Sequence, residues 1–344
     1  MAGRISGNEV VIDNPSEAIR NYNKGYFGRM VGETLHLHLI EASFLVEIGR
    51  VEVERDGKTV TLNELMDMGI KVHPNFEISY LVFRDLRQRG YVVRIPQDGE
   101  DGFDLYPRGG APHSHSPTYL VKAISERSPF LISRISDWIN GIGKRKLMLG
   151  IADEEGDLTY YSVKFFRMRG KMKEEESYEG NITVMGDRSM VWDEELSKKL
   201  QENFIGRTFE ENVVQLSLME TAYLVEKGAT AMKGNKKLSL KSFIKYAKKI
   251  QPDIERRLYA YKDLRSSGLI PKTGFKFGSH FRVYREHIGE GHAPYLVHVI
   301  PENYKSTWTE ISRAVRLANS VRKQMIFAIA GSGIDYIRIK RMTP

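Results

Sequence analysis

The sequence contains no cysteine and no long run of apolar residues. Without cysteine the chain can form no disulfide, no thiolate zinc site and no cysteine nucleophile. No stretch approaches the roughly 20 consecutive apolar residues that a membrane-spanning helix needs. The N-terminus also lacks the charged-then-apolar pattern of an export signal. These absences predict a cytoplasmic protein with no membrane partner.

Positive charge is in excess and unevenly distributed. The 52 lysines and arginines against 44 acidic residues give a formal net charge of +8. In the last forty residues eight basic side chains face only Glu310 and Asp335, which gives a local net charge of +6. Such clustering is typical of surfaces that bind a polyanion, although a solvated basic face has the same composition.

Most of the sequence consists of two copies of one internal repeat. Segment 40–47 (IEASFLVE) returns at 219–226 (METAYLVE), and segment 80–87 (YLVFRDLR) returns at 258–265. Likewise 103–106 (FDLY) matches 281–284 (FRVY), and 119–121 matches 295–297. The offset between the copies changes only from 179 to 176 residues along the chain. A repeat of this length is far too long for a solenoid. The pattern predicts a tandem duplication of whole domains.

Each copy is expected to hold two subdomains, in a mixture of α/β and α+β architecture. The first is a small α+β subdomain, at 1–68 and again at 188–246. The second, at 69–170 and 247–344, has a mixed sheet flanked by helices, because short strands alternate with covering helices there. A charged linker is expected at 171–187, which includes the run Lys-Glu-Glu-Glu at 173–176.

The clearest helix is expected near residues 307–320. Trp308, Ile311, Val315 and Ala318 keep the spacing of one helical face, and Thr307 with Glu310 can form a capping box. In the first copy Ile132, Ile135, Ile139 and Ile142 repeat the same steps. Strands at 325–330 and 336–339 are expected to follow, joined by a Gly-Ser-Gly turn at 331–333.

Three segments of the second copy carry the functional argument. They read GSHFRVY at 278–284, HAPYLV at 292–297 and NSVRK at 319–323. Together, in this order and inside a duplicated chain, they resemble the signature segments of the archaeal tRNA-splicing endonucleases of the two-repeat, homodimeric type. The resemblance implies that 247–344 is the catalytic nuclease domain and that 69–170 is its degenerate, non-catalytic counterpart.

By this resemblance Tyr284, His292 and Lys323 form the catalytic triad. The implied reaction is metal-independent: an RNA 2′-hydroxyl attacks the neighbouring phosphate and expels the 5′-oxygen. A histidine with an ordinary pKa near 6.5 can donate a proton at neutral pH, and an ammonium can stabilise the charged phosphorane. We therefore assign His292 as general acid and Lys323 as electrostatic stabiliser. For Tyr284 a general base and a purely orienting hydrogen bond both fit the sequence.

Two arginines acquire a role from the same resemblance. The family clamps a bulged base between two guanidinium planes, and the matching residues are Arg316 and Arg338. Arg316 precedes Lys323 by two helical turns, so it lies on a similar face. Stacking on guanidinium planes is a common way for proteins to hold unpaired RNA bases.

The first copy has lost this set of residues. Tyr106 persists, but Ser116 stands opposite His292 and Arg145 stands opposite Lys323. Its acidic turn carries Asp153, Glu154, Glu155 and Asp157, where the second copy has Gly-Ser-Gly. In the family an acidic loop at this place docks into a basic cleft of a second copy, which predicts a homodimer; a plain solvated turn is the alternative.

The sequence therefore predicts a tRNA-intron endonuclease. It should cleave precursor tRNA at bulge-helix-bulge sites and leave 2′,3′-cyclic phosphate and 5′-hydroxyl ends. The competing hypothesis is an inactive RNA-binding or structural subunit of a splicing endonuclease. No cofactor is predicted. No metal site is predicted either, since His113 and His115 are too few ligands to hold an ion.

Overall fold

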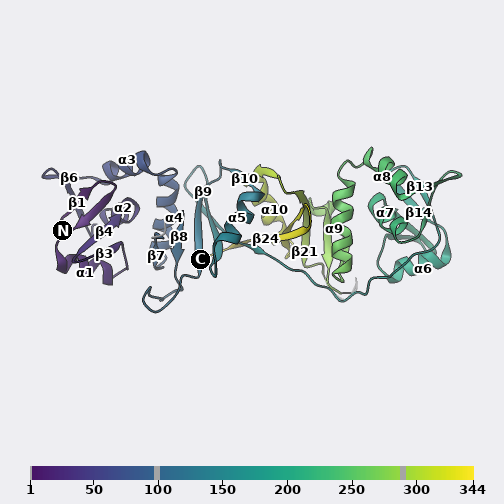
Figure 1. Ribbon diagram of the computed structural model, residues 1–344, viewed down its shortest axis with the longest axis horizontal. Helices are drawn as coiled ribbons and strands as arrows, with labels where there is room; N and C mark the ends of the chain where they lie inside the picture. The colour runs from purple at the N-terminus through teal and green to yellow at the C-terminus, as the bar shows by residue number, and fades with distance from the viewer. Residues whose placement is uncertain (1, 97–100, 287–291) are drawn as a thin grey trace. The chain divides into compact units, whose positions relative to one another are not determined.

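The computed structural model describes residues 2–96, 101–286 and 292–344 (Figure 1). These residues form two compact units, described separately below. Unit 1 comprises residues 1–164, 305–311 and 341–344, and unit 2 comprises 165–304 and 312–340. Among the residues within these limits, no helix is long and apolar enough to cross a membrane.

The first subdomain of unit 1 is a six-stranded sheet with three helices. The strand order is β3-β4-β2-β1-β5-β6, and only the β1–β5 pair is parallel. The strands are β1 Ala2–Ser6, β2 Glu9–Ile12, β3 Arg29–Val31, β4 Thr34–His38, β5 Glu52–Arg55 and β6 Lys58–Val60. The helices are α1 Pro15–Asn23, α2 Leu39–Glu47 and α3 Leu62–Val72. Residues 2–23 supply two of these strands and one helix.

The second subdomain of unit 1 is a mixed sheet in the order β7-β8-β9-β11-β12. The parallel pair β9–β11 is connected through α5, and the other pairs are antiparallel. Its elements are α4 Phe76–Gln88, β7 Val93–Arg94, β8 Phe103–Leu105, β9 Tyr119–Ser125, β10 Pro129–Leu131, α5 Ile132–Gly141, β11 Lys146–Ala152 and β12 Leu158–Phe165.

The second copy repeats this sequence of elements. Its first subdomain has the strand order β15-β16-β14-β13-β17-β18, again with one parallel pair, β13–β17. The elements are β13 Asn181–Met185, β14 Arg188–Val191, α6 Glu194–Glu202, β15 Arg207–Glu210, β16 Val213–Ser217, α7 Leu218–Glu226, β17 Thr230–Lys233, β18 Lys236–Leu238 and α8 Leu240–Lys248. The equivalence of the two orders accounts for the repeat seen in the sequence.

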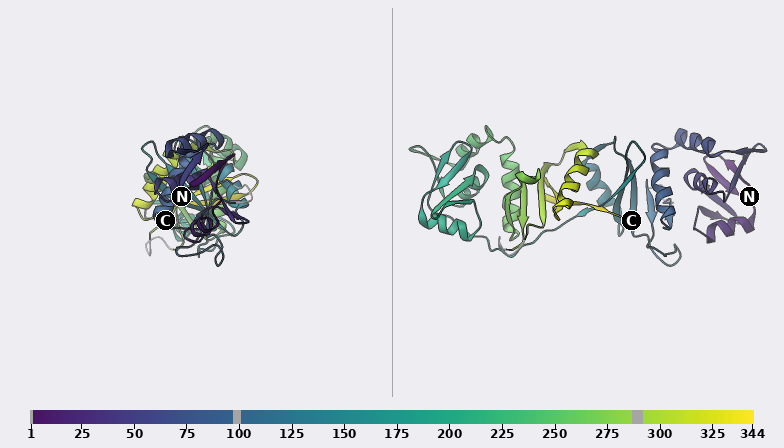
Figure 2. Two further views of the ribbon diagram at one scale, coloured as in Figure 1. Left: turned by 90° about the vertical axis from the view of Figure 1, so that its left-hand side faces the viewer. Right: turned by 180° about the vertical axis from the view of Figure 1, so that it is seen from behind.

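The second subdomain of this copy has the strand order β19-β20-β21-β23-β24. The elements are α9 Ile254–Ser266, β19 Ile270–Thr273, a 3-10 turn η1 Phe275–Phe277, β20 Phe281–Tyr284, β21 Tyr295–Pro301, β22 Lys305–Thr307, α10 Trp308–Ser320, β23 Gln324–Ala330 and β24 Ile334–Met342. Helix α9 packs on β19, β21 and β23 (Figures 1 and 2). The predicted fold class, a duplicated chain with mixed sheets and flanking helices, is confirmed.

The last part of segment 171–187, which the sequence predicted as a linker, contains a strand. Strand β13 occupies Asn181–Met185, and Ile182 and Val184 point into the core of the N-terminal sheet. The strand is only five residues long and follows directly on the run of charges, so the charged composition concealed its alternation. The first subdomain of the second copy therefore begins near residue 181 rather than 188.

Residues 305–311 belong to unit 1 although they lie in the second copy of the sequence. Strand β22 pairs antiparallel with β10, and the Trp308 indole meets the Phe130 ring edge to face at 5.0 Å. The Thr307 hydroxyl accepts a hydrogen bond from the Glu310 backbone at 3.3 Å, so the expected N-terminal cap is present. The Glu310 carboxylate accepts from the Ser306 hydroxyl.

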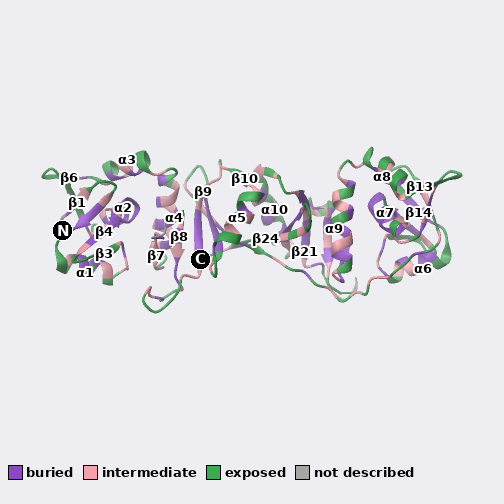
Figure 3. Cartoon of the chain, in the orientation of Figure 1, coloured by how far each residue is buried: buried purple, intermediate pink, exposed green. Residues whose placement is uncertain are grey.

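A buried carboxylate anchors the most enclosed helix of each copy (Figure 3). Glu41 on α2 accepts hydrogen bonds from the backbone nitrogens of Gly28 and His38 at 2.9 and 3.2 Å. Glu220 on α7 accepts from the backbone nitrogens of Gly206 and Ser217, both at 3.0 Å. Because these bonds close a capping box and pin a neighbouring turn, both carboxylates are structural.

Candidate active site

Three neighbouring strands of the second mixed sheet end together where the predicted triad lies. Val283 on β20 pairs with Tyr295 on β21, and Tyr295 pairs with Gln324 on β23. One step beyond this row are Tyr284 on β20, Pro294 before β21 and Lys323 before β23. The register therefore brings the backbones of Tyr284 and Lys323 to one edge of the sheet, with His292 two residues before Pro294.

Lys323 reaches toward the segment that carries His292. Its Nζ donates to the carbonyl oxygen of Ala293 at 2.8 Å, and Ala293 directly follows His292. Helix α10 has already ended at Ser320, and Arg322 adopts a left-handed conformation with φ of 56°. This left-handed residue turns the chain out of the helix and into β23. Lys323 is thus held at the sheet edge and does not cap the helix.

A second cation, Arg282, lies beside Lys323 and Tyr284. Arg282 and Tyr284 are two residues apart on β20, so their side chains leave the same face of the sheet. The Arg282 Cζ is 5.8 Å from the centre of the Tyr284 ring, and its buried Nε has no hydrogen-bond partner among the described residues. Partial burial, and then the charge of Arg282, lower the pKa of Lys323 below its usual 10.5. Sequence reasoning missed Arg282, although its spacing from Tyr284 on a strand was a usable signal.

The other two members of the triad are accessible. His292 is exposed, and Tyr284 is half-buried. The residues directly before His292, at 287–291, lie outside the described part of the chain. An accessible imidazole and phenol at the edge of a sheet, with an ammonium tethered nearby, are suited to bind and transfer protons to an external substrate.

The two predicted clamp arginines are in different settings. Arg338 on β24 donates from Nη1 to the side-chain oxygen of Gln324 at 3.0 Å, next to Lys323. One face of its guanidinium lies over the Phe166 ring, with 4.9 Å between Cζ and the ring centre. Arg316 is exposed on α10, and among the described residues it shares no hydrogen bond or ion pair with the other site residues.

The equivalent edge in unit 1 is closed by an ion pair. Leu105 pairs with Tyr119, and Tyr119 pairs with Lys146, so Tyr106 and Arg145 occupy the places of Tyr284 and Lys323. Arg145 Nη1 lies 2.8 Å from Asp104 Oδ1, and both side chains are only 18% exposed. Asp104 stands where the second copy has Arg282. The first copy thus neutralises its cation internally, whereas the second keeps two cations together.

The acidic residues 153–157 form an exposed turn between β11 and β12. Asp153 Oδ1 accepts from the backbone nitrogens of Glu155 and Asp157 at 3.1 and 2.9 Å. Glu154 forms an ion pair with Arg127 at 2.7 Å, although both side chains are well exposed. The negative charge of the turn is therefore partly neutralised within the chain.

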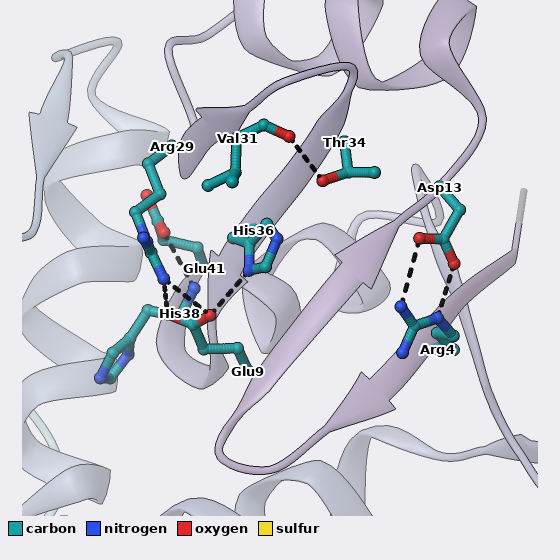
Figure 4. Close-up of polar contacts among 9 residues, drawn as sticks. All are labelled: Arg4, Glu9, Asp13, Arg29, Val31, Thr34, His36, His38 and Glu41. Carbon is teal, nitrogen blue, oxygen red and sulfur yellow. Dashed lines mark hydrogen bonds and ion pairs between the residues drawn. The ribbon is translucent and has the colours of Figure 1, made fainter.

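Cavities of similar size occur at equivalent places in the two copies, away from the triad. One of about 410 Å³ is bordered by Arg207, Gln215, Glu220, Lys272 and His280. The other, of about 390 Å³, is bordered by Glu9, Arg29, His36, His38 and Glu41. Figure 4 shows that Arg29 and His36 both contact the Glu9 carboxylate, at 3.1 and 2.9 Å. The Glu9 carboxylate thus has its partners within the chain, and we interpret Glu9, Arg29 and His36 as a structural cluster.

The remaining acidic and histidine residues form no metal centre in the described part of the chain. There, no group of three or more histidine, aspartate or glutamate side chains is arranged to hold an ion. Asp253 forms an ion pair with Arg257 at 2.7 Å and lies 3.9 Å from His280. His113 and His115 lie on an exposed turn, where His113 packs against Tyr26.

Two family models match the chain, each of them twice. The tRNA intron endonuclease catalytic C-terminal domain matches residues 76–160 and 254–336, and the tRNA intron endonuclease N-terminal domain matches 1–66 and 182–244. A tRNA-splicing endonuclease of Methanococcoides burtonii is 40% identical over 93% of this chain and 94% of its own length. One from Methanosarcina acetivorans is 37% identical over 99% of both chains, and one from Haloferax volcanii is 29% identical over the full length of both.

Proposed function

This chain belongs to the tRNA intron endonuclease family, as its three C-terminal segments predicted, and from that premise we propose that it cuts introns out of precursor tRNA. We propose further that it recognises bulge-helix-bulge sites and leaves a 2′,3′-cyclic phosphate and a 5′-hydroxyl. The observation that carries the proposal is the convergence of Tyr284 and Lys323 at one sheet edge, with Lys323 bonded beside His292.

The reaction needs a proton removed from the 2′-hydroxyl, which then attacks the adjacent phosphorus. The bond from phosphorus to the 5′-oxygen breaks, and His292 donates the proton that this oxygen takes up. Tyr284 either accepts the proton of the 2′-hydroxyl or orients that hydroxyl by a hydrogen bond. In the first role Tyr284 starts as the phenolate and takes the proton, whereas in the second role the proton passes to a solvent water.

Charge on the phosphorane is the second requirement. Lys323 and Arg282 present two cations at the same edge, where their fixed positions stabilise negative charge as it develops. Partial burial and the charge of Arg282 lower the pKa of Lys323 from its usual 10.5. The inactive-subunit alternative applies better to the first copy, where Asp104 neutralises Arg145.

The substrate claim is tested with matched RNA hairpins. Wild-type protein should cleave a hairpin that carries two bulges flanking a short helix, and it should leave a fully paired hairpin of equal length intact. A bulged hairpin with a 2′-deoxy sugar at the scission site should bind but not react, since the nucleophile is missing. Equal cleavage of bulged and fully paired RNA would contradict bulge recognition, and cleavage of the deoxy substrate would contradict attack by the 2′-hydroxyl.

A further inference from the structure

A short loop between β19 and β20 presents an aromatic side chain to solvent. Phe275 begins the 3-10 turn Phe275–Phe277 and is 87% exposed, more than any other large apolar side chain in the described residues. Lys276 beside it is exposed as well. Exposing a phenyl ring forgoes the free energy that its burial would contribute, so such a ring points to a binding role.

The loop that carries Phe275 is held in one conformation. Gly274 N donates to His280 O at 3.1 Å, and Phe277 N donates to Gly274 O at 2.8 Å. Ser279 is buried, and its hydroxyl donates to Phe281 O at 3.2 Å. A Cβ on Gly274 would lie 2.4 Å from the Ser279 hydroxyl, so glycine is needed at that position. Phe275 is thus exposed on a braced turn and is not the end of a loose loop.

This turn lies next to the proposed active site. The Nζ of Lys323 is 5.7 Å from the centre of the Phe277 ring. Phe275 is two residues away from Phe277 in the same turn. An RNA strand that places a phosphate against Lys323 therefore passes close to the exposed ring.

The two copies differ sharply at this loop. Arg94 pairs with Asp104 and Lys272 with Arg282, and eight residues lie between Arg94 and Phe103 just as eight lie between Lys272 and Phe281. The sequences therefore align without a gap: Phe-Lys-Phe at 275–277 stands opposite Gln-Asp-Gly at 97–99. At these three positions, aromatic and basic residues occur only in the copy that carries the predicted triad.

We propose that Phe275 is a stacking platform for an unpaired RNA base next to the scission site, and that Lys276 contacts the adjoining phosphate. The inference rests on the proposed function and adds a binding residue to it. Aromatic rings bind unpaired bases through their π-faces, and a neighbouring cation attracts the backbone. A second protein copy is the competing occupant of the exposed ring.

The test is binding of an uncleavable RNA by the full-length protein. A bulged hairpin with a 2′-deoxy sugar at the scission site carries 2-aminopurine at one bulged position at a time. Phe275→Ala should weaken binding by about ten- to a hundredfold and abolish the fluorescence quenching at one bulged position. Phe275→Tyr should restore both, because the tyrosine ring also stacks. Lys276→Ala should weaken binding less, and mainly at low salt.

Phe209→Ala is the matched control, since Phe209 is also exposed, at 63%, but lies on β15 in the other subdomain. It should leave binding and quenching unchanged. Binding of Phe275→Ala within twofold of wild type would overturn the proposal, as would loss of the dimer in this variant, which would assign the ring to a contact between copies. Wild-type cleavage of bulged RNA is measured in parallel, so failure of the platform remains distinct from failure of the proposed function.

Discussion

The two copies carry opposite charges at one position beside the proposed site. At the position before Val283 the second copy has Arg282, and at the equivalent position the first has Asp104. Arg282 repels a neighbouring lysine, whereas Asp104 pairs with a neighbouring arginine. Two like charges held together cost free energy in the absence of an anion, and an RNA phosphate offsets that cost.

His292 is the residue whose loss should separate chemistry from binding. His292→Ala is expected to reduce single-turnover cleavage of bulged RNA by about 10²–10⁴-fold, since it removes a general acid. RNA affinity should change little, because the exposed imidazole serves proton transfer, while Lys323 and Arg282 supply the positive charge at the site. The double variant His113→Ala, His115→Ala is the control and should keep the wild-type rate. A His292→Ala enzyme within twofold of wild type would remove this residue from the mechanism.

Arg282 should set the alkaline limit of the reaction. Because the pKa of Lys323 is lowered, its ammonium is lost at a lower pH than for a free lysine, and cleavage should decline there. Arg282→Gln removes a like charge and should move this decline to higher pH, while Arg282→Lys keeps the charge and should leave it in place. The pH dependence of single-turnover cleavage measures the shift. If the cleavage rate of Arg282→Gln declines at the same pH as that of wild type, Arg282 does not act on Lys323.

At the scale of single elements, strands β20 and β21 are joined by a partly buried pair of histidines. The rings of His280, just before β20, and His298, on β21, stack with 4.2 Å between their centres. His280 Nδ1 accepts from the Val299 backbone nitrogen at 2.8 Å. Burial, and then the neighbouring His298, lower the pKa of His280 to about 3. The strands that carry Tyr284 and lead away from His292 thus depend on a neutral imidazole.

This pair should make the second copy sensitive to acid. In the unfolded chain His280 takes up a proton below about pH 6.5, while in the folded chain it stays neutral down to about 3. Stability should therefore be lost as pH falls below 6.5, with a slope of at most roughly 1.4 kcal/mol per pH unit for one proton. Free energies of unfolding, measured with urea between about pH 4 and 6.5, should fall less steeply with decreasing pH for His280→Gln than for wild type. The glutamine amide oxygen can still accept the hydrogen bond from Val299. His292→Gln is the control and should retain the wild-type slope.

How far these elements could be predicted depended on their length and pattern. Helix α10 and strand β23 were predicted close to their limits because their apolar residues keep a clear period. Strand β13 was missed because five residues next to a run of charges give too weak an alternation. The hydrogen-bond partners of Glu41 and Glu220 could not be predicted. In the sequence, a buried carboxylate that binds backbone nitrogens cannot be told from any other helical glutamate.

The same contrast holds for the site. Tyr284, His292 and Lys323 were predicted through the family resemblance of their segments, and their roles stay predictions. The position of Arg282 and the hydrogen bond from Lys323 to Ala293 needed the strand register. Arg145 and Asp104 are forty-one positions apart in the sequence, and no local pattern predicts that they pair. Contacts between distant strands are decided by topology, which the periodicity of a single strand does not reveal.

At the scale of the whole molecule, we propose a homodimer in which the turn at 153–157 contacts the basic surface of a second copy. The turn exposes its carboxylates, and the last forty residues carry a net charge of +6. Complementary charges of this kind favour association, and a two-fold axis would make two such contacts. The ion pair of Glu154 with Arg127 reduces the charge available, so Glu155 and Asp157 should contribute most.

Neutralising the turn should weaken the dimer and lower cleavage together. The variant is Glu154→Gln, Glu155→Gln, Asp157→Asn, with Asp153 retained because its carboxylate holds the turn. Sedimentation velocity at several protein concentrations should show dissociation at higher concentration than for wild type. Glu194→Gln, Glu195→Gln on α6 is a control that removes exposed charge elsewhere. A turn variant that stays fully dimeric and fully active would make the turn an ordinary solvated hairpin.

The central claim is that side chains of the second copy alone perform the chemistry on RNA. It is tested most directly by cleavage of a bulge-helix-bulge RNA in excess EDTA, with mass analysis of the new ends. The account predicts undiminished cleavage that yields a 2′,3′-cyclic phosphate and a 5′-hydroxyl. Cleavage that stops in EDTA and returns only with Mg²⁺ or Mn²⁺ on an RNA shown to stay folded, or products with 3′-hydroxyl and 5′-phosphate ends, would contradict it.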